Sequence, residues 1–340
     1  MQASVPPLRQ RATLIVGAML AFSIATLLFA GMTGSIRVPL HEIPDALRQL
    51  ANGQSDSLSA SLLKLRTSRA LVAFATGGAL ALAGLMMQAL LRNPLADPYV
   101  LGVSSGASVG ALLALLLMAS TLMVDAAALA GAIGVAMLLY LLARRDLRSG
   151  QAAEGGASML LLTGVIVSAL CGSVVTLMLS IAPEGRLRSM IFWLIGDLAG
   201  APLRLAPWLV LAGCLLFAMR NARAMNMVAL HAENAVTLGV RVGALRKGLF
   251  FVSALLTASA VTSAGAIGFV GLIVPHACRF AFGPDHRVLI PATVLSGGAF
   301  LVLCDTLART IIAPQQLPVG AITAMIGAPV FLYQLHRLRK

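Results

Sequence analysis

The stretch ALVAFATGGALALAGLMMQALL, residues 70–91, contains no Asp, Glu, Lys or Arg. Three further stretches, residues 12–32, 155–182 and 248–278, share this lack of charge. The hydrocarbon core of a bilayer is about 30 Å thick and is crossed by roughly 20 apolar helical residues. Helices of water-soluble proteins alternate polar and apolar faces instead. The uncharged stretches therefore predict an all-α polytopic membrane protein.

The composition of the whole chain agrees with this class. The sequence is 59% hydrophobic and 11% charged, and its mean hydropathy is +0.92. This leaves no room for a large soluble domain, so we expect residues 1–340 to form a single transmembrane domain. A segment at 190–199 is too short to cross the bilayer and is expected at one surface. A window of about 20 residues predicts about ten spans, at 12–33, 69–91, 98–117, 121–143, 156–181, 203–220, 245–263, 266–281, 288–308 and 316–335.

The distribution of basic residues predicts the orientation. An even number of spans places both termini on one side of the membrane. That side would hold 16 of the 25 Lys and Arg residues and the opposite side 9. Because cytoplasmic loops carry an excess of Lys and Arg, both termini are expected in the cytoplasm. Much of the net charge of +13 is then positive-inside bias, so it does not indicate nucleic-acid binding.

A group of cations lies on the side where positive charge is disfavoured. Lys64, Arg66 and Arg69 fall within six residues, and Arg309 lies at the outer end of the ninth expected span. A single arginine there often extends its charged end to the lipid headgroups. A group of cations can instead bind an acidic surface, since the planar guanidinium takes a carboxylate through two hydrogen bonds. The sequence leaves both interpretations open, and the second predicts a docking site for an extracytoplasmic partner.

The largest expected cytoplasmic loop runs over residues 220–247. Within it, residues 229–237 are typical of a short helix that ends at Gly239. Leu230 and Leu238 would supply apolar contacts. Such a helix could be a plain connector, or a lever moved by a cytoplasmic partner, and the periodicity does not separate the two.

Several kinds of chemistry have no support in the sequence. There is no G-x-x-x-x-G-K-[ST] loop for ATP, and the five histidines lack metal-ligand spacing. No catalytic pair or triad has a local signature, which disfavours an intramembrane enzyme. Asp305 is the one carboxylate expected at membrane depth, and its spacing to Arg309 predicts an i,i+4 ion pair on one helix face.

Four stretches of the chain resemble one protein family. The chain is similar to the permease subunits of type II ABC importers for vitamin B12, haem and ferric siderophores, in order from about residue 62 to the C-terminus. The stretches that carry the resemblance are LLKLRTSRALVAFATGGALALAGLMMQALLRNPLADPYVLGVSSGA (62–107), AMNMVALHAENAVTLGV (224–240), GAIGFVGLIVPHACRFAFGPDHR (265–287) and LPVGAITAMIGAPVF (317–331).

The resemblance implies a specific assembly. Permeases of this family have ten spans and pair as homodimers, with the translocation path between the two copies. Two cytoplasmic ATPase subunits bind them from below, and a periplasmic binding protein delivers the substrate from above. The chain would itself bind no cofactor and no metal and would not be an enzyme, because the partner ATPase uses the ATP. Its location would be the bacterial inner membrane.

The resemblance also implies roles for individual residues. Arg66, Arg69 and Arg309 match the family's arginines that meet glutamates on the two lobes of the binding protein, and Lys64 lies beside them. The cytoplasmic gate would lie at the start of the fifth span, at Gly156, Ala157 and Ser158. The segment 225–241 matches the part that inserts into the ATPase, although His231 replaces the usual glycine and Asn234 a common charged residue. The coupling residues would be Ala229, Leu230, Glu233, Leu238 and Gly239.

These expectations together predict that the chain takes part in ATP-driven import of a bulky metal chelate by alternating access. The resemblance implies a metal chelate as the cargo, and we expect an iron complex, haem or a ferric siderophore, with cobalamin close behind. An ion-coupled secondary transporter acting alone is the alternative. That class buries several ionisable residues at mid-membrane, whereas here only Asp305 is expected there.

Overall fold

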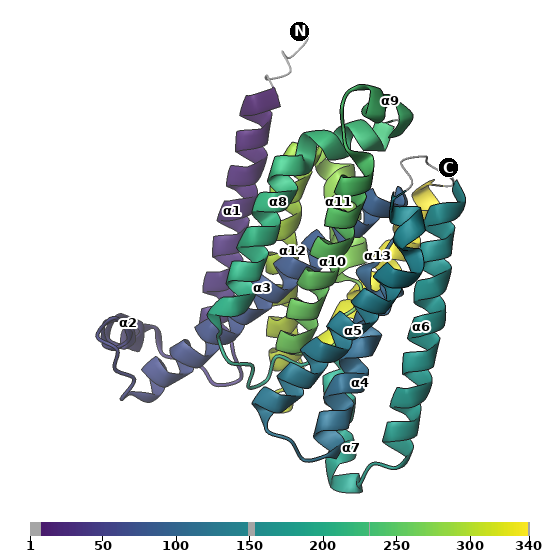
Figure 1. Cartoon of the computed structure of the whole chain (residues 1–340). Coiled ribbons are helices and arrows are strands. Elements are labelled where there is room, and N and C mark those ends of the chain that lie inside the picture. The colour runs from purple at the N-terminus through teal and green to yellow at the C-terminus, as the bar shows by residue number, and fades with distance from the viewer. Residues whose placement is uncertain (1–7, 149–153, 231, 339–340) are drawn as a thin grey trace.

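The computed structural model describes residues 8–148, 154–230 and 232–338, and all regular elements in these ranges are helices. Figure 1 shows them as a bundle with α9 at one end and α7 at the opposite end. The first turns of α1 and the last turns of α13 lie at the α9 end. The elements are α1 (Leu8–Met32), η1 (Leu40–Glu42), α2 (Ile43–Ala51), α3 (Leu58–Leu91), η2 (Pro98–Leu101), α4 (Val103–Leu116), α5 (Thr121–Arg148), α6 (Glu154–Ser180), α7 (Glu184–Ile195), α8 (Leu205–Leu230), α9 (Ala232–Thr237), α10 (Val242–Ala264), α11 (Val270–Phe282), α12 (His286–Thr310) and α13 (Val319–Leu338).

Within the described ranges, seven helices are long and apolar enough to cross a membrane, and these are α1, α3, α5, α6, α8, α10 and α12. Each corresponds to one of the expected spans. The other three expected spans are the shorter apolar helices α4, α11 and α13. The bundle is thus that of a polytopic membrane protein, and its ten crossings stay a prediction, since only seven of the described helices are long enough to span by themselves.

Two of the short helices begin later than predicted, so the expected starts at residues 98 and 266 are wrong. Gly102 has φ 73° and separates the short 3₁₀ helix η2 from α4. Gly265 and Phe269 have φ 70° and 71°, and this left-handed backbone holds the chain out of a helix until Val270. A left-handed residue interrupts the hydrogen bonding of a right-handed helix, and a hydropathy window does not detect it.

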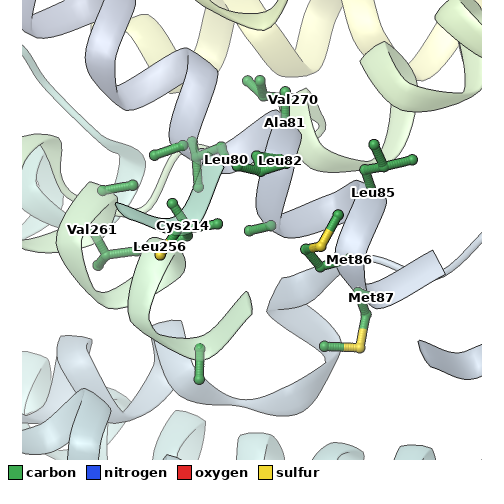
Figure 2. Close-up of a cluster of buried hydrophobic side chains, with 14 of the residues drawn as sticks. Leu80, Ala81, Leu82, Leu85, Met86, Met87, Cys214, Leu256, Val261 and Val270 are labelled. Atoms are coloured by element: carbon green, nitrogen blue, oxygen red, sulfur yellow. The ribbon is translucent and has the colours of Figure 1, made fainter. Parts of the chain in front are cut away.

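Helix α3 is the centre of the bundle. Its 34 residues span about 51 Å at 1.5 Å per residue, and 94% of its apolar window is buried, against 17% for α1. Figure 2 shows Leu82 and Met86 of α3 in one cluster with Leu256 of α10 and Val270 of α11. Because α3 touches α10, α11 and α12, it connects the helices that carry the features described below.

Candidate functional site

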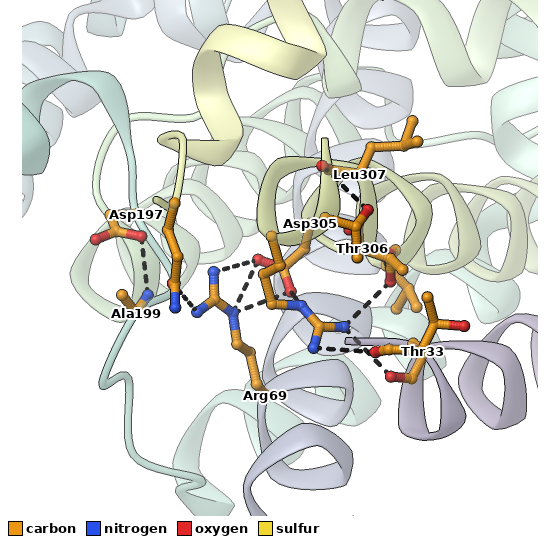
Figure 3. Close-up of polar contacts among 12 residues, drawn as sticks. Thr33, Arg69, Asp197, Ala199, Asp305, Thr306 and Leu307 are labelled. Carbon is orange, nitrogen blue, oxygen red and sulfur yellow. Dashed lines mark hydrogen bonds and ion pairs between the residues drawn. The ribbon is translucent and has the colours of Figure 1, made fainter. Parts of the chain in front are cut away.

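A buried carboxylate joins two of the predicted docking arginines near the end of the bundle opposite α9. Asp305 of α12 is 1% exposed. Nε of Arg69, on α3, donates to both of its oxygens at 3.0 Å, and Nη2 donates to Oδ1 at 2.7 Å. Nε of Arg309 lies 3.2 Å from Oδ2, which confirms the predicted i,i+4 pair. Figure 3 shows Asp305 beside the guanidinium group of Arg69.

Arg309 and the third predicted docking arginine, Arg66, bind carbonyl groups at the end of α1 and just after it. Nη2 of Arg309 donates to the carbonyl of Ala30 at 3.3 Å. Nη1 of Arg66 donates to the carbonyl of Met32 at 3.2 Å, and its Nη2 donates to that of Ile36. Carbonyls in the last turn of a helix lack partners within the helix and carry partial negative charge, so cations stabilise them. The arginines therefore hold α1, α3 and α12 together.

The structure thus brings Arg66, Arg69 and Arg309 together, as the docking prediction requires, but their donors are largely occupied. Arg66 and Arg309 are 6% and 7% exposed, and the side chain of Arg69 is 13% exposed. Arg69 also donates from Nη1 to Oε1 of Gln316 at 2.8 Å. Lys64, one turn earlier on α3, is exposed. We call Lys64, Arg66, Arg69, Asp305 and Arg309 the arginine cluster.

Sequence reasoning missed the second partner of Asp305. Arg69 and Asp305 lie 236 positions apart, and no spacing rule connects residues on different helices at that distance. The i,i+4 rule assigned Asp305 to Arg309 alone. The useful signal was electrostatic. Three cations expected around a single carboxylate at membrane depth leave the group with excess positive charge, so the carboxylate can pair with more than one of them.

The coupling segment, residues 225–241, lies at the opposite end of the bundle (Figure 1). The described residues of the predicted helix 229–237 are all helical: Ala229 and Leu230 belong to the last turn of α8, and residues 232–237 form α9. The predicted stop is confirmed. Gly239 has φ 83°, its N–H donates to Val236, and this left-handed glycine ends α9.

Apolar side chains of the coupling segment are exposed. Leu230 and Leu238 are 75% and 69% exposed, and Val236 is 51% exposed. Glu233 lies in α9, and its side chain is outside the described residues, as is the whole of His231. Large apolar side chains exposed close together favour a protein contact.

A polar contact ties this segment to α12. Nδ2 of Asn226, on α8, donates to Oδ1 of Asp285 at 2.7 Å, and Oδ1 of Asn226 accepts from the N–H of His286 at 2.9 Å. Burial raises the pKa of Asp285, but hydrogen bonds from Arg287 N–H and Asn226 outweigh it, so the pKa lies below its usual value. Because α12 carries Asp305 and Arg309 near its other end, one helix connects the coupling segment with the arginine cluster.

The predicted gate residues Gly156, Ala157 and Ser158 lie in the first turns of α6. Their side chains are outside the described residues, so the gate stays a prediction. Among the residues that the structure describes, no three His, Cys, Asp or Glu side chains come together as a metal site.

Comparisons with known proteins identify the family of this chain. The model of the FecCD transport family matches residues 13–337. The cobalamin import system permease protein BtuC of Halobacterium salinarum is 43% identical over 80% of this chain and 72% of its own length. The hemin transport system permease protein HmuU of Yersinia pestis is 39% identical over 82% of this chain and 84% of its own.

A solved structure, described as a metal-chelate type ABC transporter in an inward-facing conformation, superposes with a TM-score of 0.80. It is 29% identical and the match covers 96% of this chain and 99% of that one. PsaBC from Streptococcus pneumoniae, at 16% identity and a TM-score of 0.54, shares the fold. With a family match along nearly its whole length, the chain belongs to the FecCD transport family and is a permease of the ABC importer class that carries vitamin B12, haem and metal chelates.

Proposed function

We propose that this chain is the transmembrane subunit of an ATP-driven importer that carries a bulky metal chelate from the periplasm to the cytoplasm. The observation that carries the proposal is the family match over residues 13–337. The arrangement of the bundle supports it, because a cationic cluster and an apolar segment occupy its two ends and α12 connects them. In this proposal the chain supplies the translocation path and the coupling segment that moves it, and a separate ATPase supplies the energy.

In the proposed assembly, residues 1–340 form one domain with ten crossings and both termini in the cytoplasm. Two copies pair in the bacterial inner membrane around the path. Two ATPase subunits bind the coupling segments, and a periplasmic binding protein docks on the arginine clusters. Closure of the ATPase pair would move α9 and, through Asn226, α12, which opens one side of the path as the other closes.

The cargo in this proposal is haem or a ferric siderophore, with cobalamin close behind. Relatives that resemble the chain about equally are named for cobalamin and for hemin. The alternative of an ion-coupled carrier relies on Asp305 as a free ionisable group. That carboxylate is held by two arginines, which leaves it poorly suited to bind and release an ion in each cycle.

Reconstituted uptake tests the proposed function. Proteoliposomes holding this chain, its ATPase and its binding protein are supplied with haemin, ferrichrome or cyanocobalamin. We expect accumulation of one chelate that requires ATP and the binding protein together. Accumulation driven by a proton or sodium gradient without ATP would overturn the proposal.

Lys64 provides the cleanest test of docking. Reversal of Arg66 or Arg69 would place a carboxylate against carbonyl groups or against Asp305, and would disturb folding as well as docking. Lys64 is exposed, so Lys64→Glu should leave folding intact. We expect about a tenfold slower association with the binding protein at low salt, and a smaller difference near 0.5 M salt, where charges are screened within about 4 Å.

Surface plasmon resonance on permease in nanodiscs measures this rate. Arg223→Glu makes the same change of charge on the exposed surface of α8 near the coupling segment and should leave association unchanged. Equal slowing by both variants, or by neither, would remove Lys64 from the docking surface.

Gly239 tests the coupling segment. The residue has φ 83°, a conformation that strongly disfavours a β-branched side chain, and a Cβ there would meet no other atom within 4 Å. We therefore expect Gly239→Val to reshape the end of α9 and to lower ATP-driven uptake at least about tenfold, with ATP hydrolysis by the complex retained. Gly53 has φ 75° and equally open space, so Gly53→Val is the matched control and should leave uptake unchanged.

A further inference from the structure

A cavity of about 380 Å³ lies where the end of α7 meets the end of α10. Its lining combines aromatic, cationic, acidic and hydroxyl side chains, and these are Arg188, Ser189, Phe192, Trp193 and Asp197. A second hollow of about 160 Å³ adjoins it and shares Trp193 and Asp197. Ligand sites in proteins are concave and place a few polar groups among apolar ones, and this cavity combines both kinds of lining.

The backbone around the cavity is fixed by hydrogen bonds between the two helix ends. The N–H of Asp197 donates to the carbonyl of Ala264 at 2.9 Å, and the N–H of Ala266 donates to that of Trp193 at 3.4 Å. Gly265 has φ 70°, and a Cβ there would meet the carbonyl of Trp193, so the two backbones approach as closely as glycine permits. The backbone that carries Trp193 is therefore held in place before any ligand arrives.

The polar groups of the cavity differ in how far they are already satisfied. Arg188 lies 5.5 Å from the ring centre of Phe192, is exposed, and has no ion pair within the described part of the chain. Asp197 accepts a hydrogen bond from the N–H of Ala199 at 2.9 Å. Arg204 lines the adjoining hollow and forms an ion pair with Asp125 at 2.6 Å. Arg188 is thus the cation left available for an anionic group of a ligand.

The cavity is joined to the arginine cluster by a short stretch of backbone. Arg69 donates to Gln316, and four residues later the N–H of Gly320 donates to the carbonyl of Gly196 at 3.4 Å. Gly196 directly precedes Asp197, and Figure 3 draws Asp197 and Arg69 in the same close-up. Cargo released by a partner docked at the cluster would meet this cavity early on its way.

We propose that this cavity is a cargo subsite for a flat, aromatic metal chelate that bears a carboxylate. The ring system would stack on Trp193 and Phe192, and the carboxylate would form a bidentate ion pair with Arg188. Asp197 would accept a hydrogen bond from the metal-bound water or from a donor on the ring edge. The inference rests on the proposed function and narrows its cargo, because haem has such carboxylates whereas the corrin side chains of cobalamin are neutral amides.

Uptake in proteoliposomes tests the subsite, because it measures the maximum uptake rate and the KM for the loaded binding protein separately. Arg188→Gln should lower the maximum uptake rate of haemin about tenfold, the effect of losing a hydrogen bond between charged groups. The KM for the loaded binding protein should stay unchanged, because docking uses other residues. Arg188→Lys keeps the charge and should recover part of the rate. Cyanocobalamin uptake, where measurable, should fall less than twofold.

Direct binding of haemin separates failure of the subsite from failure of the proposed function. Haemin is titrated against permease in nanodiscs without the binding protein, and its Soret absorbance is followed. Arg188→Gln and Trp193→Ala should each weaken binding about tenfold, and Arg48→Gln, an exposed cation on α2, should not. Equal haemin affinity in all four proteins would overturn the subsite, as would equal loss of haemin and cobalamin uptake. If the wild type carries no chelate at all, the proposed function fails and the titration still decides the subsite.

Discussion

Asp305→Ala should destabilise the protein by about 3–5 kcal/mol, the cost of removing one partner from a buried ion pair. Asp305 is 1% exposed and neutralises both Arg69 and Arg309. Without it, two guanidinium groups that are 13% and 8% exposed would face each other with no negative charge between them. Chemical denaturation in detergent micelles, followed by circular dichroism, measures the loss.

The control for this variant is an ion pair nearer the surface. Asp125 binds Arg204 at 2.6 Å, and the side chains are 18% and 37% exposed. Asp125→Ala should cost no more than about 1 kcal/mol, because solvent screens the cation that remains. Asp305→Asn keeps an oxygen that accepts hydrogen bonds but loses the charge. Its stability should lie between that of the wild type and that of Asp305→Ala. Equal stability of Asp305→Ala and Asp125→Ala would show that Asp305 does not neutralise the cluster.

The same geometry bears on docking. An arginine whose donors are occupied by Asp305 and Gln316 binds a partner's carboxylate only by sharing or exchanging those contacts. In the proposed docking, the fixed guanidinium planes would set the geometry of the site, and exposed Lys64 would add charge that speeds the encounter. A site of this kind is specific in orientation but gains less affinity per contact than three free arginines would give.

Most of the secondary structure could be predicted because it depends on local composition. Each expected span has an apolar helix at its place, and the Asp305–Arg309 pair followed from helical spacing alone. Gly239 was identified as the end of a helix because a left-handed glycine is the usual terminator. These features need only neighbours within one turn of the chain.

The features that were missed depend on contacts between distant segments. Arg69 meets Asp305 across 236 positions, and the cavity beside Trp193 exists only because the ends of α7 and α10 are hydrogen-bonded. The extra segment was predicted at residues 190–199, but α7 begins at Glu184. Arg186 and Arg188 lowered the hydropathy there, although Arg186 donates to the carbonyl of Leu115 and the helix forms around it.

Gly84→Leu should be as damaging as the loss of Asp305, through overpacking together with the loss of a hydrogen bond between α3 and α11. Gly84 is where α3 crosses α11, and a Cβ on it would collide with the carbonyl of Gly271. Because Pro275 has no N–H, that carbonyl lacks its partner four residues on. The amide of Gln88, one turn along α3, lies 3.5 Å from it and 3.3 Å from the next carbonyl.

A leucine at position 84 would push α3 and α11 apart. The cost of overpacking and the cost of losing the Gln88 hydrogen bond would then add. Overpacking of a close crossing costs about 1–3 kcal/mol, and leaving the carbonyl of Gly271 buried without a partner costs about 1–3 kcal/mol more. Gly134 of α5 has no atom within 4 Å of its would-be Cβ, so Gly134→Leu should be neutral or slightly stabilising, because leucine favours a helix more than glycine does. Denaturation of the two variants in the same micelles gives the comparison. If Gly84→Leu unfolds at the same denaturant concentration as Gly134→Leu, α3 and α11 are not in the close contact on which the centre of the bundle depends.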